Sequence, residues 1–208
     1  MRVIRNRPGP APGTEWDKPA QRPPGGRLSP HGAVVAIGNF DGLHLGHRAL
    51  IGRCQRLAAA GAAVGSVEAR LAVAVVTFEP LPQAFFRPQQ APARLSTVYQ
   101  KLDTLRALGV DLVWLTRFDA QFAGLSAHDF VERALVADLG AKHVVIGEDF
   151  RFGRGRQGDV ALLRELGVEF GFEVQVEPAV HRDGERISSS GIRAHLAAAE
   201  FDAAAECL

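Results

Sequence analysis

From Ala33 onward, strand-like and helix-like segments alternate five times along the chain. Short β-branched runs bounded by glycine or polar residues predict strands, and each is followed by a segment with apolar residues at helical spacing. The strands are expected at 33–38, 71–78, 111–118, 142–147 and 172–177, and the helices at about 46–60, 97–108, 127–139, 159–167 and from 187 onward. Because this alternation is typical of βαβ units, we expect an α/β fold: a doubly wound, mainly parallel, five-stranded Rossmann-like sheet with helices on both faces.

Composition and charge exclude several classes of protein. The 208 residues suit one domain, and 47% hydrophobic with 23% charged residues is the balance of a soluble globular protein. A formal charge of +1 provides no overall field for holding nucleic acid or an anionic membrane, and no apolar run reaches membrane-spanning length. Two cysteines, Cys54 and Cys207, are too few for a disulfide framework. We therefore expect a cytoplasmic enzyme that acts on small molecules, with neither nucleic acid nor membrane as a partner; the sequence indicates no oligomeric state.

The first 32 residues differ from the rest of the chain. Residues 1–32 hold seven of the twelve prolines and several arginines, with almost no apolar periodicity. Val3 and Ile4 could add a short edge strand, but we expect the remainder to be a poorly ordered arm. The functional domain is therefore expected to span residues 33–208.

Two histidines lie where the first strand gives way to a helix. In such sheets ligands bind at the carboxyl ends of the strands, so the segments after the strands carry the candidate site. His44 and His47 are three residues apart, which places both rings on one side of a helix start, and Gly46 between them leaves the backbone open. The free N–H groups of the helix start add to a site for phosphate. A helix cap or surface histidine, or a zinc pair, is the alternative, although no third zinc ligand has a convincing spacing.

A second candidate anion site opens the last helix. Ser188, Ser189 and Ser190 provide hydroxyls beside the first amides of that helix, and the planar guanidinium of Arg193 follows one turn later. This pattern suits the anionic oxygens of phosphate groups. The alternative is an ordinary serine N-cap with a surface arginine.

Two further features follow the fourth strand. Phe150 and Phe152 could wall a flat ring or simply pack in the core. The segment 153–158 matches G-x-G-x-x-G, which leaves an NAD-binding oxidoreductase as an alternative. The strand at 142–147 ends six residues before Gly153, whereas a dinucleotide turn follows its strand tightly, so we favour the phosphate sites.

Four segments together resemble a known family. GNFDGLHLGH at 38–47 resembles the H-x-G-H signature of the nucleotidylyltransferase superfamily, and ISSSGIR at 187–193 resembles its second signature. GEDFRFG at 147–153 and FEPLP at 78–82 resemble further segments of the FAD synthetase (FMN adenylyltransferase) module of bacterial bifunctional riboflavin kinase/FAD synthetases. The resemblance covers the chain from Ala33 to Leu208.

The chain departs from that family's pattern at three points. Leu81 stands where the family commonly has a polar residue, which puts substrate positioning in doubt, and Ser190 stands where threonine is usual. No sequence for a riboflavin kinase module is recognisable, so we expect either a monofunctional adenylyltransferase or a fragment of a bifunctional enzyme.

The resemblance implies transfer of AMP from ATP to FMN, which yields FAD and pyrophosphate. Mg²⁺ would accompany ATP, held largely by the phosphates, and no protein ligand to the metal is assigned. The implied catalytic residues are His44 and His47, which would steady the α-phosphate, and Ser189, Ser190 and Arg193, which would hold the departing pyrophosphate. The implied ATP-binding residues are Gly38, Asn39, Phe40, Asp41, Gly46, Gly147, Asp149 and Ser188. The implied flavin-binding residues are Phe78, Pro80, Pro82, Phe150 and Phe152. Asp41 could instead order the loop or serve as a plain turn residue. Another small-molecule nucleotidylyltransferase, or an impaired remnant that binds nucleotide or flavin, remains an alternative.

Overall fold

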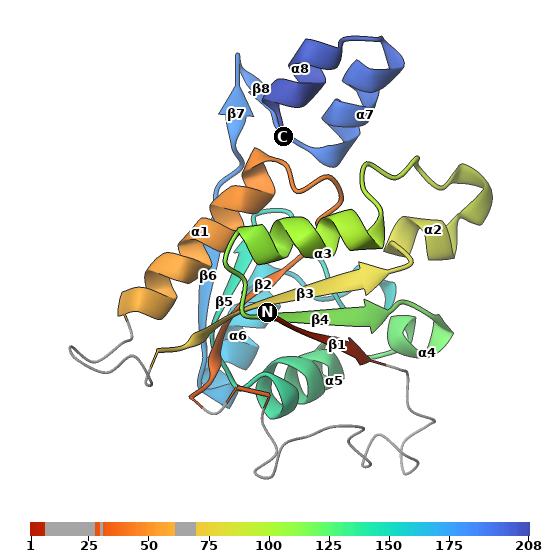
Figure 1. Cartoon of the computed structure of the whole chain (residues 1–208). Coiled ribbons are helices and arrows are strands. Elements are labelled where there is room, and N and C mark those ends of the chain that lie inside the picture. The colour runs from red at the N-terminus through yellow and green to blue at the C-terminus, as the bar shows by residue number, and fades with distance from the viewer. Residues whose placement is uncertain (7–27, 30, 61–69) are drawn as a thin grey trace.

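A computed structural model describes residues 1–6, 28–29, 31–60 and 70–208 (Figure 1). Six strands form one sheet in the order β1-β4-β3-β2-β5-β6, and every neighbouring pair is parallel. The strands are β1 (Arg2–Asn6), β2 (Ala33–Ile37), β3 (Ala72–Glu79), β4 (Leu112–Arg117), β5 (Ala141–Gly147) and β6 (Glu173–Glu177). The predicted doubly wound parallel sheet is confirmed, with six strands instead of five.

The additional strand is β1, at the edge of the sheet beside β4. Val3 pairs with Val113 and Ile4 with Trp114, so these two residues form the short edge strand that was expected as a possibility. The expectation of a poorly ordered arm falls mainly on residues 7–27, which lie outside the described residues.

Helices cover both faces of the sheet (Figure 1). The main helices are α1 (Leu45–Ala60), α3 (Val98–Ala107), α5 (Ala127–Phe130) continued by the π-helical segment η3 (Val131–Asp138), α6 (Val160–Phe170) and α7 (Ser189–Ala197). Shorter elements are α2 (Pro82–Phe86), η2 (Pro88–Gln90), α4 (Ala120–Ala123), η4 (Arg154–Arg156), β7 (His181–Arg182), β8 (Glu185–Arg186) and α8 (Phe201–Glu206). No helix among the described residues is long and apolar enough to cross a membrane.

The strand residues alternate between two apolar cores. Val34 and Ala36 of β2 face the core beneath α1 and α3, whereas Val35 and Ile37 face the core beneath α5, η3 and α6. Because successive side chains of a strand point to opposite faces, a strand buried on both faces must be apolar at every position. This explains why AVVAI reads as a continuous apolar run rather than as an alternating one.

Strand order reverses between β2 and β5. From β2 the chain moves outward through β3 to β4, then returns to place β5 on the other side of β2. Ligands of doubly wound sheets bind at the carboxyl ends of the strands beside such a reversal. A third, small apolar core lies close to this edge: Ile187, Ile192 and Cys207 pack there with Leu45 of α1. It attaches α7 and α8 to the beginning of α1, as Figure 1 shows.

Candidate active site

The two predicted histidines form a stacked pair at the start of α1. Their ring centroids are 3.7 Å apart and the ring planes meet at 22°. The backbone N–H of His47 donates to Nδ1 of His44 over 3.4 Å. A Cβ on Gly46 would lie 3.2 Å from the His44 ring, so glycine at this position leaves room for that ring. The helical spacing read from the sequence therefore brings both rings together as predicted.

Burial keeps both imidazoles neutral in the free protein. Desolvation is the main reason why the pKa of His44 is lowered to about 4; the charge of Arg186 lowers it further and Asp41 opposes the change. The pKa of His47 is held well below its usual value by burial, by His44 and by Lys101. Protonation of either ring at neutral pH would therefore require the negative charge of a ligand.

The turn between β2 and α1 has an unusual backbone. Phe40 and Leu43 have φ values of 50° and 46°, and Gly42 lies between them at 78°. Residues other than glycine hold such angles only where the surroundings enforce them. Here the Phe40 side chain is fully buried and its ring lies 4.9 Å from the His47 ring, while Leu43 is buried in the same core. Phe40, implied to bind ATP, therefore supports the histidines from within.

Asp41 is used within the protein to fix that turn. Its carboxylate accepts hydrogen bonds from the backbone N–H of Leu95 and of Ser96, each over 3.1 Å, and also bonds to the guanidinium of Arg193. The hydroxyl of Ser96 adds a bond of 3.3 Å to the same oxygen. Of the roles considered for Asp41, the structure shows loop ordering.

The second predicted anion site lies directly against the first. The hydroxyl of Ser189 donates to the carbonyl oxygen of Asp41 over 2.9 Å, and Arg193 bridges the Asp41 carboxylate and the carbonyl oxygen of Ala93. Ser188 is the N-cap of α7, because its hydroxyl accepts the N–H of Gly191 over 3.0 Å. Ser190 is exposed in the first turn. The two signatures, about 145 residues apart in sequence, thus meet at one edge of the sheet.

Arg193 and Asn39, two of the predicted site residues, form hydrogen bonds within the protein. Arg193 is not a surface arginine: its side chain is 18% exposed, and its Nε and one terminal nitrogen are engaged within the protein. Asn39 is exposed and follows Gly38 at the end of β2. Its carbonyl oxygen accepts bonds from Thr77 and Lys101.

Arg186 is a site residue that the sequence analysis missed. It ends β8 just before the second signature and bonds through its guanidinium to Asp149 over 2.9 Å. Asp149 follows Gly147, the last residue of β5, so this ion pair links the loop after β5 to the start of α7. The charge of Arg186 also acts on His44. Arg186 could have been predicted from the sequence, because it directly precedes the ISSSGIR segment.

The predicted flavin-binding residues lie along a set of aromatic contacts. Phe150 stacks on Phe152 at 5.4 Å, and Phe152 is buried against Phe130, so the core-packing alternative describes Phe152. Phe78 packs edge-on to Phe118 at 5.8 Å. Phe118 in turn contacts Phe85 and Phe86, each at 5.6 Å. We call the residues of these contacts the phenylalanine cluster: Phe78, Phe85, Phe86, Phe118, Phe122, Phe130, Phe150 and Phe152.

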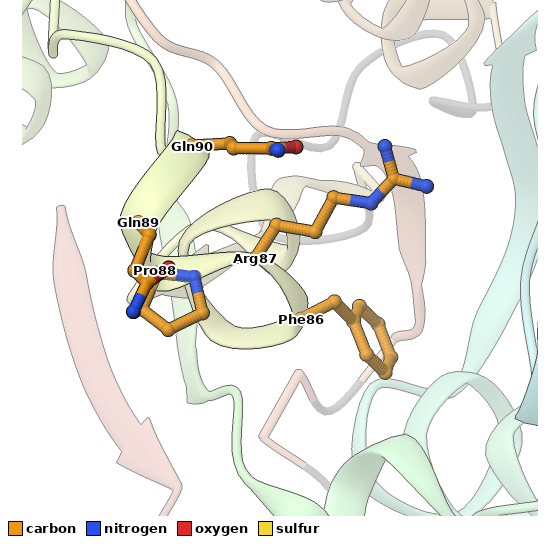
Figure 2. Close-up of a pocket in the computed structure, with 5 residues that line it drawn as sticks. All are labelled: Phe86, Arg87, Pro88, Gln89 and Gln90. Carbon is orange, nitrogen blue, oxygen red and sulfur yellow. The ribbon is translucent and has the colours of Figure 1, made fainter.

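The cluster reaches the surface beyond the FEPLP segment. Pro80 is half-buried, and Pro82 begins α2 directly after the buried Leu81. A surface pocket follows on the same segment, lined by Phe86, Arg87, Pro88, Gln89 and Gln90. Figure 2 shows Phe86, Arg87 and Gln90 extending to one side of this turn. Since the five lining residues are consecutive and exposed, this pocket is a shallow surface feature, separate from the histidine pair.

The two alternative site chemistries lack support in the described residues. The GRGRQG segment lies in a loop that closes with a bridge between Phe152 and Gly158, well after β5 ends at Gly147, so it does not form a tight dinucleotide turn. Within the described ranges, no group of three or more His, Cys, Asp or Glu side chains could hold a metal ion, which leaves the histidine pair without zinc partners there.

Comparison with known proteins agrees with this geometry. A family model described as FAD synthetase matches residues 27–191. The bifunctional riboflavin kinase/FMN adenylyltransferase of Pseudomonas fluorescens is 44% identical over 177 residues, which cover 85% of this chain and 54% of that protein. The protein of the same description from Escherichia coli (strain K12) is 44% identical over 166 residues, 80% of this chain and 50% of that one. The chain thus spans about half the length of the curated relatives it matches.

Two solved structures share the fold. A crystal structure described as a macrolide-efflux protein from Streptococcus pneumoniae superposes with a TM-score of 0.66 and 28% identity, covering 80% of this chain and 51% of that one. A pantoate–β-alanine ligase from Francisella tularensis gives a TM-score of 0.51 and 17% identity, covering 79% and 66%, a similarity of fold alone. The family model and the 44% identical relatives together show that the chain belongs to the FAD synthetase family.

Proposed function

We propose that this chain is an FMN adenylyltransferase, which transfers AMP from ATP to FMN and releases FAD and pyrophosphate. The observation that carries the proposal is the meeting of the two signatures: Ser189 bonds to the turn that presents His44 and His47. We assign the activity to residues 33–208 and propose a cytoplasmic location, which the small number of cysteines supports. The family match and the 44% identical relatives support the choice of ATP and FMN as substrates.

The reaction needs positioning and charge neutralisation rather than a covalent intermediate. An oxygen of the FMN phosphate attacks the α-phosphorus of ATP in line, a new P–O bond forms, and the bond between the α-phosphorus and the bridging oxygen breaks. The electron pair leaves with pyrophosphate. His44 and His47, neutral beforehand, donate hydrogen bonds to the α-phosphate as its charge grows.

The departing pyrophosphate would lie over the start of α7. The exposed Ser190 would offer its hydroxyl there, together with the first amides of α7, while the Ser189 hydroxyl is donated to the Asp41 carbonyl and fixes this helix start against the histidine turn. Arg193 shapes this cradle through its bonds to Asp41 and to the carbonyl oxygen of Ala93. Arg186, which pairs with Asp149 in this structure, would supply a further positive charge beside His44.

Magnesium would enter with ATP. The Asp41 carboxylate is occupied by Leu95, Ser96 and Arg193, whereas Asp149 is exposed, pairs with Arg186, and would approach a metal–nucleotide complex on leaving that partner. This donor set fits an ion that keeps waters and phosphate oxygens as most of its ligands. When bound, Mg²⁺ neutralises part of the triphosphate charge.

The flavin ring would lie against the phenylalanine cluster. Phe78 and Phe150 are half-buried and Phe86 is exposed, so these rings can contact a flat ligand, with Phe152 supporting them from beneath. Pro80 and Pro82 border the same region between β3 and α2.

One assay tests the proposed activity. Purified protein with Mg-ATP and either FMN or riboflavin is analysed by chromatography of the flavins. We expect FAD from FMN and no FMN from riboflavin. ATP binding without FAD formation would instead show an impaired remnant, and adenylylation of a different small molecule would favour another nucleotidylyltransferase.

A substitution tests the role of the histidine pair. His47→Ala removes one charge-stabilising donor, and such losses typically cost about 100- to 1000-fold in rate. The matched control is His128→Ala, which removes an exposed imidazole on α5. FAD formation by His47→Ala within threefold of wild type, with the fold intact, would show that the pair is structural.

A further inference from the structure

A buried lysine lies beneath the turn that carries the histidine pair. Lys101 of α3 is 2% exposed. Its ammonium donates to the carbonyl oxygen of Asn39 over 2.8 Å and to the hydroxyl of Thr77 over 3.4 Å. Thr77 donates to the same carbonyl over 3.0 Å, so the three groups form a closed set at the ends of β2 and β3.

This ammonium has an unusual set of partners. Among the residues that the structure describes, no carboxylate lies within 4.0 Å of it, although a buried lysine is ordinarily paired with one. The charged groups whose fields reach it are Glu79, Asp41 and Arg94. Burial lowers the pKa of Lys101, while the two carboxylates oppose that change. An apolar side chain of similar length would avoid this desolvation cost, so stability alone does not explain a lysine here.

The position of Lys101 connects it to the candidate site. The Asn39 carbonyl precedes Phe40, the first residue of the positive-φ turn, so the ammonium anchors the turn where it leaves β2. The charge of Lys101 also acts on the His47 ring and lowers its pKa, in the same direction as burial and the neighbouring His44. Since Lys101 is enclosed, it acts on a ligand through the turn and through its field, without touching the ligand.

We propose that Lys101 is a positioning residue that anchors the Asn39 turn and places a fixed positive charge behind the triphosphate site. The inference rests on the proposed use of ATP at this site. A buried cation that water does not screen strengthens the binding of a polyanion over the turn, and this increase in affinity depends on the number of phosphates. An adenosine without phosphates gains nothing from the charge.

The test compares Lys101→Met with Lys142→Met, which removes an exposed lysine on β5. Binding of a non-hydrolysable Mg-ATP analogue and of adenosine is measured by calorimetry. We expect Lys101→Met to weaken binding of the analogue about 10- to 100-fold, a smaller effect than the loss of a directly bound donor. The affinity for adenosine should stay within about twofold of wild type. Turnover should fall with little change in the KM for FMN. Lys142→Met should match wild type in each measurement.

A second measurement is independent of activity and of nucleotide. The pKa of the His47 imidazole, followed by NMR in the free protein, should rise in Lys101→Met because a neighbouring positive charge is removed. A purely structural lysine would not produce this change together with a phosphate-dependent loss of affinity. If Lys101→Met does not fold, Lys101→Arg keeps the charge while disturbing the hydrogen bond, and should retain affinity for the analogue while turnover falls.

Two results would overturn the inference: equal losses for adenosine and the analogue, or a Lys101→Met protein with wild-type affinity, turnover and His47 titration. Failure of the proposed function is a different outcome, since it would appear as the absence of FAD formation by the wild-type protein. In that case the His47 titration still tests the charge of Lys101.

Discussion

Replacing Asp41 by asparagine should destabilise the protein much more than the loss of an ordinary ion pair. The Asp41 side chain is 3% exposed and that of its partner Arg193 is 18% exposed. The two carboxylate oxygens receive four donor groups, from Leu95, Arg193 and both the amide and the hydroxyl of Ser96. The Asp41→Asn change would keep the shape of the side chain but turn one acceptor into a donor that faces other donors, and it would leave the guanidinium without its counter-charge.

The magnitude follows from these contacts. Hydrogen bonds to charged groups contribute about 1.5–3 kcal/mol each, and removing one partner of a buried pair costs about 3–5 kcal/mol. Because Arg193 retains some exposure and its bond to Ala93, we take the lower end, about 3 kcal/mol. For a chain of this size each kcal/mol lowers the Tm by roughly 2–4 °C, so the expected loss is about 6–12 °C.

The assay is urea unfolding followed by circular dichroism, with a thermal scan alongside. The matched control is Asp103→Asn, which breaks a pair with Arg106 in which the two side chains are 71% and 60% exposed. That control should change the free energy of unfolding by less than about 0.5 kcal/mol. An Asp41→Asn protein within about 1 kcal/mol of wild type, at an unchanged m-value, would refute the view that Asp41 fastens the two signatures together.

Two further outcomes are expected. The folded-state pKa of His44 is about 4 and its ordinary value is 6.5, so the unfolded chain binds more protons than the folded protein between these pH values. The free energy of unfolding should therefore be highest above about pH 6.5 and fall by about 1–3 kcal/mol as the pH drops to 4. Unfolding measured at each pH should show a smaller fall in His44→Gln. A His44→Gln profile that parallels wild type would contradict this. Phe86→Ala should raise the KM for FMN about 3- to 10-fold and leave the KM for ATP unchanged, because one ring contact contributes about 0.5–1.5 kcal/mol; Phe86 is 61% exposed, so the fold should persist, and Tyr99→Ala, an exposed aromatic on α3, is the control in steady-state assays.

The sequence was sufficient for the framework because periodicity determines which faces are buried. All five expected strands are present, and α1, α3 and α6 begin and end within about three residues of their predicted bounds. The helix expected over 127–139 is present but becomes π-helical from Val131, a change of hydrogen-bond register that apolar spacing does not encode. Short elements such as α2 and α4 were missed, since four or five residues are too few to show a period.

Site prediction failed where contacts depend on tertiary structure. The mutual placement of His44, Gly46 and His47 could be predicted because local helical spacing sets it. The partners of Asp41 come from a loop more than 50 residues away, and Lys101 lies on a helix whose pattern gives no reason to single it out. Such long-range hydrogen bonds depend on the order of the strands in the sheet. The sequence pattern predicts the strands but does not fix which residues meet across them.

The stacked arrangement of His44 and His47 sets how many protons the site can take up. At a centroid separation of 3.7 Å, a first proton on either ring makes a second one unfavourable, so the two imidazoles titrate as a single coupled unit. A negatively charged ligand that raises the pKa of the pair would therefore cause uptake of one proton, which either ring can hold. A count of protons exchanged on ligand binding would therefore register about one equivalent from the pair instead of two.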